Sequence, residues 1–262
     1  MLDQITPIIL TYNEEANIRR TLQSVRWAKK VLVVDSYSTD STLEICAKHS
    51  NVQIVQRKFD DFANQCNFAL EQDIKTEWVL SMDADYIISD GLCSEILSIN
   101  PSPNTKAFQI SFEYLIDGKK LRASLYPPRV ALYRIKTAHY HQDGHAHKVM
   151  IEGENIEQSL SSPIERLNAK ILHDDRKPYS RWLSSQSNYA TQEANKLNNL
   201  SWKELSPQDI SRKLGIAPIL VIPYTLFVRG LILDGWLGLK YTYQRFIAEH
   251  MLQIARFKKL FN

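Results

Sequence analysis

The chain has 262 residues, of which 44% are hydrophobic and 23% are charged, a composition that excludes general disorder. The formal net charge of +3 is too small to indicate a nucleic-acid partner, and the basic residues concentrate toward the C-terminus. Three scattered cysteines, Cys46, Cys66 and Cys93, favour a reducing compartment over a disulfide framework. Because the first residues show no basic and apolar leader, we expect a cytoplasmic location.

The first hundred residues alternate apolar runs with helical patterns. The apolar runs predict strands at 5–10, 31–34, 52–55 and 78–82. The patterns between them predict helices at 15–25, 41–49 and 59–72. Ser41 and Glu44 have the spacing of a capping box at the start of the second helix. This alternation is typical of a parallel sheet covered by helices, which binds ligands at the carboxyl ends of its strands.

Polar residues follow three of these predicted strands. Tyr12, Asn13 and Glu14 follow the first, Asp35 follows the second, and the sequence Asp83-Ala84-Asp85 follows the fourth. We expect these strand ends to meet at one edge of the sheet. Two carboxylates one residue apart suit a divalent cation that carries a phosphate, although acidic pairs also occur in solvated turns.

The rest of the chain changes character. Residues 106–172 show short alternating runs with a turn at Asp117-Gly118, which predicts hairpins and a mixed extension of the sheet. A polar helix is predicted at 179–200. The uncharged stretch 214–228 contains Pro218 and Pro223 and is too short for a spanning helix, which leaves an interfacial or re-entrant element as an alternative.

Three segments together resemble the nucleotide-sugar motifs of glycosyltransferase family 2: Thr11 to Ile18, Val33 to Thr42, and Asp83-Ala84-Asp85. With the later segment 231–235, the chain is also similar to the branch that includes lipopolysaccharide core β-1,4-glucosyltransferases. The resemblance implies the α/β fold called GT-A, a Rossmann-like mixed sheet flanked by helices. It divides the chain into a nucleotide-sugar-binding half at 1–100, an acceptor-side half at 101–176 and a C-terminal helical extension at 177–262.

The resemblance also implies roles for particular residues. Those expected to contact the donor are Thr11, Tyr12, Glu14, Asp35, Asn64, Asn67, Asp83, Ala84 and Arg129. Asp85 and His173 are expected to hold Mg²⁺ or Mn²⁺ between the two phosphates of the donor.

Several of these residues have structural alternatives. Glu14 also suits the first turn of a helix. Asn64 and Asn67 also suit a solvated helical face, Arg129 a salt bridge, and His173 a capping region. Tyr37 stands where many relatives have glycine, which leaves the shape of its loop open.

An inverting displacement requires a base for the acceptor hydroxyl. The resemblance favours Asp143, which lies in a histidine-rich segment beside Gly144, although Lys148 stands where many relatives have glutamate. The same segment raises a zinc alternative, because imidazole is a common zinc ligand. Its candidate ligands are His139, His141, His145 and His147. Exposed strand faces would account for the same alternation.

Other catalytic classes find no support. The chain has no Gly-x-Ser-x-Gly turn, and it has no Gly-x-Gly-x-x-Gly or Walker motif after a strand. Serine hydrolase, dehydrogenase and NTPase readings are therefore disfavoured.

These observations predict an inverting enzyme that moves a hexose, expected to be glucose, from a UDP-sugar to a hydroxyl of a lipid-linked glycan such as lipopolysaccharide core. One alternative is a polyprenyl-phosphate glycosyltransferase, and another is a catalytically silent sugar-nucleotide-binding subunit. Aromatic and basic residues alternate in the last helical region, for example Trp236, Lys240 and Arg245. This pattern predicts either peripheral attachment to the cytoplasmic face of the inner membrane, or packing of these helices on the catalytic domain or on a second subunit.

Overall fold

The computed structural model describes residues 1–143, 146–151 and 164–260. The chain divides into two units. Unit 1 consists of Met1–Asp117, Tyr126–Gln142 and His147–Arg176. Unit 2 consists of Gly118–Leu125, Asp143–Ala146 and Lys177–Asn262.

Unit 1 is built on a mixed sheet, in which strands follow the order β3-β2-β1-β4-β8-β6-β11-β5. The strands are β1 (Ile5–Thr11), β2 (Val31–Asp35), β3 (Val52–Gln56), β4 (Trp78–Asp83), β5 (Tyr86–Ile88), β6 (Ala107–Ile116), β8 (Arg129–Arg134) and β11 (Ile164–His173). Strands β1, β2, β3 and β4 run parallel to one another, whereas β8 is antiparallel to both β4 and β6. The four predicted strands and the mixed extension are therefore confirmed.

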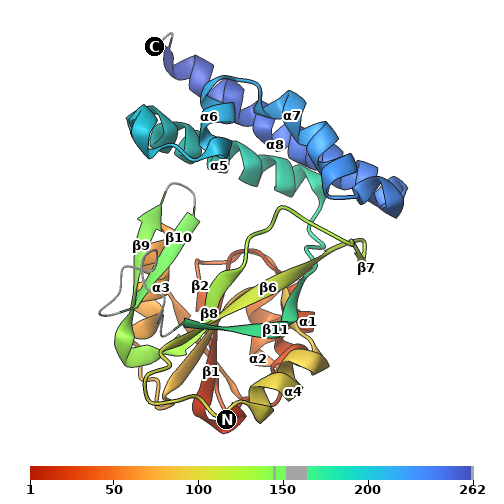
Figure 1. Ribbon diagram of the computed structural model, residues 1–262. Coiled ribbons are helices and arrows are strands. Elements are labelled where there is room, and N and C mark those ends of the chain that lie inside the picture. Colours follow the sequence, from red (N-terminus) through yellow and green to blue (C-terminus); the bar gives the residue numbers. More distant parts are fainter. Residues whose placement is uncertain (144–145, 152–163, 261–262) are drawn as a thin grey trace. The chain divides into compact units, whose positions relative to one another are not determined.

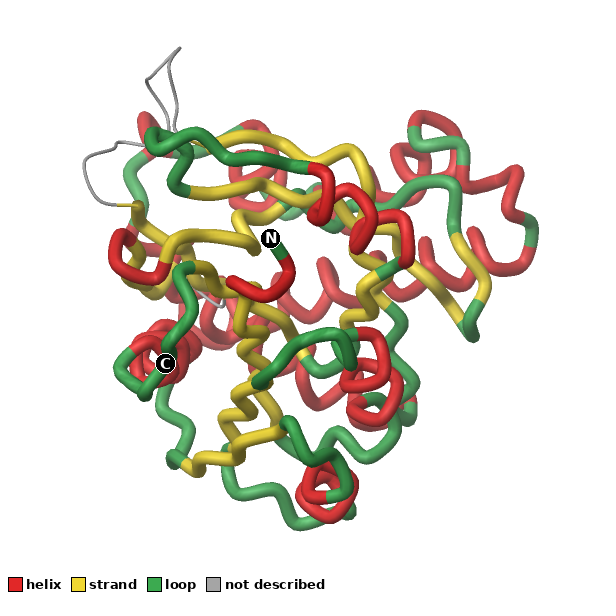
Figure 2. Tube along the Cα trace, turned by 90° about the horizontal axis from the view of Figure 1, so that it is seen from below, coloured by secondary structure: helices red, strands yellow, loops and turns green. Residues whose placement is uncertain are grey.

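Helices cover both faces of this sheet (Figures 1 and 2). They are α1 (Ile18–Ser24), α2 (Thr42–Ala47), α3 (Phe62–Leu70) and α4 (Asp90–Ser98), and short 3-10 turns η1 (Leu2–Gln4) and η2 (Ile135–Thr137) flank strands. The predicted helices are present, but α1 and α3 begin three residues later than predicted. For α3 the reason is local, because the Asp61 carboxylate caps the helix by accepting from the Asn64 N–H.

The start of α2 corrects one prediction. Ser41 is the residue before the helix, as predicted, but its side chain makes no capping hydrogen bond. Its ψ of 9° departs from the extended conformation of a capping residue. The Ser41 N–H instead donates to the Glu15 carboxylate, at 3.2 Å.

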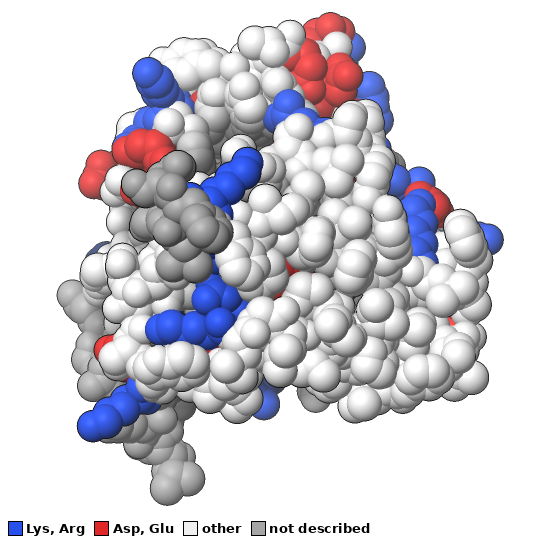
Figure 3. Space-filling model, turned by 90° about the horizontal axis from the view of Figure 1, so that it is seen from above, with Lys and Arg blue, Asp and Glu red and all other residues white. Residues whose placement is uncertain are grey.

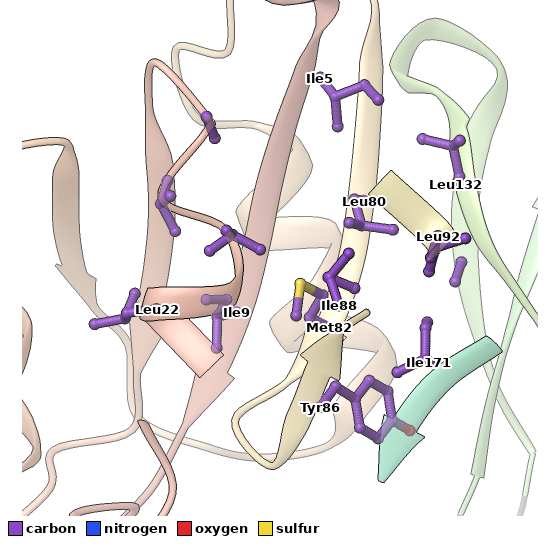
Figure 4. Packing of buried hydrophobic residues seen from close by; sticks show 14 of the residues in the cluster. Ile5, Ile9, Leu22, Leu80, Met82, Tyr86, Ile88, Leu92, Leu132 and Ile171 are labelled. Atoms are coloured by element: carbon purple, nitrogen blue, oxygen red, sulfur yellow. The ribbon is translucent and has the colours of Figure 1, made fainter. Parts of the chain in front are cut away.

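The core of unit 1 has two layers because strand side chains alternate between the faces. Ile5 and Ile9 of β1 pack in one cluster with Leu22 of α1 and Leu92 of α4, and Figure 4 shows these side chains with Met82 of β4. Ile8 lies in the other cluster, with α3 and with the separate two-stranded sheet of β9 (Ala138–Asp143) and β10 (Ala146–Ile151). Buried side chains therefore pack on both faces of the strands whose ends carry the polar residues.

The turn after β6 agrees with its predicted form. Asp117 and Gly118 have φ values of 51° and 75°, which a tight two-residue hairpin turn requires, and β7 (Lys119–Lys120) begins directly after them.

Unit 2 is mainly helical. Its elements after β7 are α5 (Tyr179–Asn199), η3 (Trp202–Glu204), α6 (Pro207–Lys213), α7 (Ala217–Pro223), the π-helical η4 (Tyr224–Val228), η5 (Leu231–Asp234) and α8 (Trp236–Leu260). Leu197 of α5 packs against Leu252 of α8, and the Arg212 guanidinium bridges the carboxylates of Glu193 and Glu249. The predicted polar helix is confirmed as α5. Within the described ranges, no helix combines the length and the apolar character needed to cross a membrane.

Candidate functional site

The carboxyl ends of three neighbouring strands lie at one edge of the sheet. Thr11 of β1 lies opposite Asp35 of β2, and Leu10 lies opposite Asp83 of β4. Ligands of open parallel sheets bind beyond such ends. The predicted meeting of these strand ends is confirmed, and this edge is the candidate site.

Asp35 is fully buried at this edge and is held by the protein on several sides. Its carboxylate accepts hydrogen bonds from Thr11 Oγ1 at 3.0 Å, from the Ser38 N–H at 2.9 Å and from Gln56 Nε2 at 3.1 Å. A buried carboxylate is tolerated only with such donors. Asp35 therefore fixes the loop after β2 in relation to β1 and β3.

The loops after β1 and β2 form one connected wall. The Asn13 N–H donates to Ser38 Oγ at 2.8 Å, and the Thr39 N–H donates to Asn13 Oδ1 at 2.7 Å. Asn13 and Tyr37 both have left-handed backbones, with φ of 54° and 61°. This conformation explains why glycine suits the position of Tyr37. The Tyr12 and Tyr37 side chains on this wall are about half exposed.

Glu14 follows Asn13 in the loop after β1. Its N–H donates to Thr42 Oγ1 at 2.7 Å, and its carboxylate accepts from Asn17 Nδ2 at 2.9 Å. The same Asn17 amide also donates to the Asp175 carboxylate, at 2.9 Å. Glu14 is thus joined to the chain that follows β11.

The segment Asp83-Ala84-Asp85 links β4 to β5. Ala84 is buried, and its carbonyl accepts a hydrogen bond from Thr21 Oγ1 of α1. The Asp83 side chain is 35% exposed, whereas that of Asp85 is 12% exposed. The two carboxylates therefore differ, with Asp83 open to a ligand and Asp85 set deeper.

Asp85 lies against His173, at the end of β11. His173 Nε2 is 3.3 Å from Asp85 Oδ2 because β5 and β11 pair with Tyr86 opposite His173. Burial of the ring opposes its protonation, but the charge and hydrogen bond of Asp85 and the charge of Asp83 outweigh burial and raise the pKa of His173 above its usual value. Tyrosine rings surround the imidazole: Tyr86, Tyr114 and Tyr126.

The Asp85 carboxylate and the His173 imidazole are groups that can bind a divalent cation. Mg²⁺ and similar cations are commonly held by one or two protein ligands together with substrate phosphates and water. Nδ1 of His173 has no hydrogen-bond partner among the described residues, so the ring is oriented by its packing and by Asp85 alone. The part of the chain that the structure describes contains no group of three or more His, Cys, Asp and Glu side chains suited to a metal ion. A cation at this position would therefore take most of its ligands from a bound nucleotide sugar.

Arg129 places a cationic group beside Asp83. Its Nη1 lies 3.7 Å from Asp83 Oδ2 and 3.4 Å from Tyr86 Oη, and its guanidinium stacks over the Tyr126 ring. The salt bridge considered from the sequence is present. The same position offers positive charge to a bound phosphate.

A sequence model described as glycosyl transferase family 2 matches residues 6–143, more than half of the chain. The chain belongs to glycosyl transferase family 2. The resemblance predicted from the three motifs is confirmed at the level of the family.

Curated relatives of this glycosyltransferase include uncharacterized members of the same class. The glycosyltransferase RT0209 of Rickettsia typhi is 33% identical over 146 residues, covering 53% of this chain and 49% of the relative. Glycosyltransferase SunS of Bacillus phage SPbeta is 34% identical over 89 residues, covering 32% of this chain and 21% of SunS. The chain spans about half or less of the length of these relatives.

Solved structures show the same fold. The mannosyltransferase PcManGT from Pyrobaculum calidifontis, in complex with GDP-Man and Mn²⁺, has a TM-score of 0.51 and 15% identity, covering 96% of this chain and 87% of that chain. S. aureus TarS 1-349 has a TM-score of 0.50 and 16% identity, covering 98% of this chain and 91% of that chain. The predicted GT-A architecture is confirmed.

Two predicted donor contacts of this glycosyltransferase also have structural partners. The Asn67 amide donates to the Tyr140 carbonyl at 3.1 Å and accepts from the Tyr140 N–H at 2.8 Å, so it holds β9 against α3. Asn64 donates to the Asp61 carboxylate at 2.7 Å at the exposed start of α3. Their contact with donor stays a prediction.

Asp143, the predicted base, is the last residue of β9 and belongs to unit 2. Its Oδ1 lies 2.6 Å from Lys196 Nζ of α5. Gly144 and His145 lie outside the described residues, as do the side chains of His147 and Lys148. His139 and His141 are exposed on β9, with ring centroids 6.2 Å apart. The catalytic role of Asp143 stays a prediction.

Sequence reasoning missed a polar network behind the site. Arg20 of α1 donates to the Asp174 carboxylate and, through Nη2, to the Asp174 carbonyl at 2.9 Å, while the Asp174 N–H donates to the Asp85 carbonyl at 3.1 Å. These bonds fix Asp85 and His173 from behind. The signal available was the pair Asp174-Asp175 directly after a strand, the same pattern that identified Asp35 and Asp83.

Proposed function

We propose that this family 2 glycosyltransferase is an inverting enzyme that moves a hexose, glucose from UDP-glucose in the first instance, onto a hydroxyl of a lipid-linked glycan such as lipopolysaccharide core. The observation that carries the proposal is the edge formed by Thr11, Asp35 and Asp83, with the Asp85 and His173 pair beside it. The GDP-Man and Mn²⁺ bound to PcManGT are consistent with a nucleotide-sugar donor at this edge.

In this proposal the wall of the first two loops receives the nucleoside. Thr11, Tyr12, Glu14 and Asp35 lie on or beneath that wall. Asp83 and Ala84 meet the ribose, and Arg129, Asn64 and Asn67 meet the diphosphate and sugar. The support for Arg129 is its position beside Asp83, where a guanidinium offsets the charge of a diphosphate.

Asp85 and His173 would hold Mg²⁺ or Mn²⁺. When bound there, the cation offsets the negative charge that the departing UDP gains as the glycosidic bond to the sugar breaks. The network through Arg20 and Asp174 keeps Asp85 in place for this task.

The transfer itself is a single displacement. The acceptor oxygen forms a bond to the anomeric carbon, the bond from that carbon to the diphosphate oxygen breaks, and UDP leaves with the electron pair. Asp143 is the proposed acceptor of the hydroxyl proton. General-base catalysis of this kind contributes about 10²- to 10⁴-fold in rate.

The test is UDP release from UDP-glucose with two acceptors, a lipopolysaccharide core extract and a polyprenyl phosphate. Asp143→Asn should lose about 10²- to 10⁴-fold in turnover with the core extract, whereas the exposed Asp90→Asn on α4 should be unaffected. Activity of Asp143→Asn with polyprenyl phosphate would favour the polyprenyl-phosphate alternative. Donor binding without turnover on either acceptor would favour the silent subunit.

A lipid-linked acceptor requires the enzyme to work at a membrane. We therefore propose peripheral attachment to the cytoplasmic face of the inner membrane through the C-terminal helices. The aromatic and basic residues of α8 support this attachment.

A further inference from the structure

Unit 2 exposes a group of large apolar side chains from four consecutive elements. The group, called here the apolar surface, consists of Ile219 of α7, Phe227 and Val228 of η4, Leu233 of η5 and Trp236 of α8. Each of these residues is between 66% and 76% exposed. A group of exposed apolar side chains of this size marks a surface that contacts a partner or a membrane.

The segment that carries the apolar surface is held firmly from its other side. Leu231 and Thr225 are fully buried, and Thr225 Oγ1 lies 3.0 Å from Thr242 Oγ1 of α8. Gly238 of α8 packs so closely on this segment that an added Cβ would lie within 1.8 Å of the Leu231 carbonyl oxygen. The outward direction of the apolar residues is therefore fixed by the inward packing of their neighbours.

Basic residues border the apolar surface within the same unit. Arg122 donates from its backbone N–H and from Nε to the Asp234 carboxylate, both at 3.0 Å, and Arg229 donates to the Ser124 carbonyl at 2.8 Å. These bonds join the segment that contains Lys119 to η4 and η5. Asp234 directly follows Leu233 of the apolar surface, and Arg122 already offsets its charge.

The charge pattern along the chain points the same way. From Leu214 to Leu233 the single charged residue is Arg229. Figure 3 views the protein from above Figure 1, and much of the surface it shows carries neither acidic nor basic groups, with charged groups of both signs toward its margins. Aromatic and aliphatic side chains bordered by cations suit the boundary between lipid headgroups and acyl chains.

We propose that the apolar surface docks onto an anionic lipid bilayer. Phe227, Leu233 and Trp236 enter the headgroup region, and Lys119 and Arg229 meet lipid phosphates at its border. This assignment deepens the peripheral attachment proposed above and rests on it. It names the face that attaches and the charge of the lipid.

The experiment measures partition of the full chain onto vesicles of phosphatidylcholine alone and of phosphatidylcholine mixed equally with phosphatidylglycerol. The triple variant Phe227→Ser, Leu233→Ser and Trp236→Ser should bind the mixed vesicles about 100-fold or more weakly. Its control is Leu97→Ser, which removes a leucine that is 58% exposed on α4 of unit 1.

A separate experiment tests the role of the basic residues that border the apolar surface. The double variant Lys119→Gln and Arg229→Gln should bind the mixed vesicles about 20-fold more weakly, with little change on phosphatidylcholine. The control is Lys29→Gln with Lys75→Gln, which removes two exposed lysines from unit 1. Circular dichroism and urea unfolding confirm that each variant is folded.

The outcomes separate the proposals. Wild-type binding to mixed vesicles that the triple variant loses supports the apolar surface. If wild type and the triple variant bind equally well, the protein attaches to membranes but not through the apolar surface. If wild type does not bind, both the proposed attachment and the proposed surface are wrong. Sedimentation velocity tests a second copy of the chain as the partner. If wild type is a dimer that does not bind vesicles, and the triple variant is a monomer, the apolar surface is a dimer interface and the proposal of lipid docking is wrong. UDP release decides the transfer function independently of all these results.

Discussion

The ionisation of His173 depends on the two acidic residues at the end of β4. Asp85 is in direct contact with the ring, and Asp83 adds its charge from farther away. The ring can bind a cation only in its neutral form, because a protonated imidazole has no free lone pair. The protonation state of His173 therefore decides whether the ring can take part in binding a cation.

The pKa of His173 predicts a pH dependence of stability in the metal-free protein. Because the folded pKa is raised above the usual 6.5, the contribution of Asp85 and His173 to the free energy of unfolding is fully present below pH 6.5 and is lost as the pH rises through the folded pKa. Asp85→Asn should weaken this dependence, because Asp85 is the main cause of the raised pKa of His173, and Asp90→Asn should keep it. Urea unfolding between pH 5 and 9 in a chelator measures the difference. Identical pH profiles for wild type and Asp85→Asn would contradict the coupling.

Tyr37 carries backbone strain on the wall of the site. A non-glycine residue with a left-handed backbone costs about 1 kcal/mol or more, and glycine loses part of that gain through chain entropy. Tyr37→Gly should therefore be at least as stable as wild type and about 1 kcal/mol more stable than Tyr37→Ala, which keeps the strain. Urea unfolding of the three proteins tests this order. Equal destabilisation by glycine and alanine would show that the ring, and not the backbone, decides stability here.

At the scale of elements, side-chain amides join pieces of structure that the sequence leaves separate. Asn67 of α3 satisfies both backbone groups of Tyr140 in β9. Asp143 ends that strand, so the position of the proposed base depends on this contact.

Asn67→Ala should lower the free energy of unfolding by about 1–3 kcal/mol, because it removes two hydrogen bonds to the backbone of the buried Tyr140. Asn64→Ala, at the exposed start of α3, should cost about 0.5 kcal/mol. Hydrogen exchange at the Tyr140 amide should accelerate in the first variant and not in the second. Donor affinity measured on both variants then separates this structural role from donor contact. An unchanged Tyr140 amide in Asn67→Ala would rule out the clamp.

At the scale of the whole molecule, local patterns predicted most of unit 1. Continuous apolar runs identified β1 to β4, and the polar residues directly after them identified Asp35 and Asp83. The contact between Asp85 and His173 could not be derived from such patterns, because it depends on the pairing of β5 with β11 across 88 residues. Only the family resemblance pointed to His173.

Tertiary structure decided the remaining details. The capping box failed because the Ser41 backbone adopts a different conformation from the one that the motif requires. The network of Arg20 and Asp174 joins α1 to the end of β11, which no spacing in the sequence indicates. In unit 2 the apolar stretch was recognised from the sequence, but its division into buried and exposed sides depends on packing against α8.

We propose above that the edge of unit 1 binds a nucleotide sugar with a cation held at Asp85. The most direct measurement is calorimetric titration of UDP, UDP-glucose, UDP-galactose, UDP-N-acetylglucosamine and GDP-mannose into wild type, Asp85→Asn and Asp90→Asn, with and without Mn²⁺. We predict UDP-sugar binding that Mn²⁺ strengthens by about 10- to 100-fold in wild type and Asp90→Asn, with this gain lost in Asp85→Asn. If none of these nucleotides binds, or if Mn²⁺ strengthens binding to Asp85→Asn as much as to wild type, the proposed site is wrong.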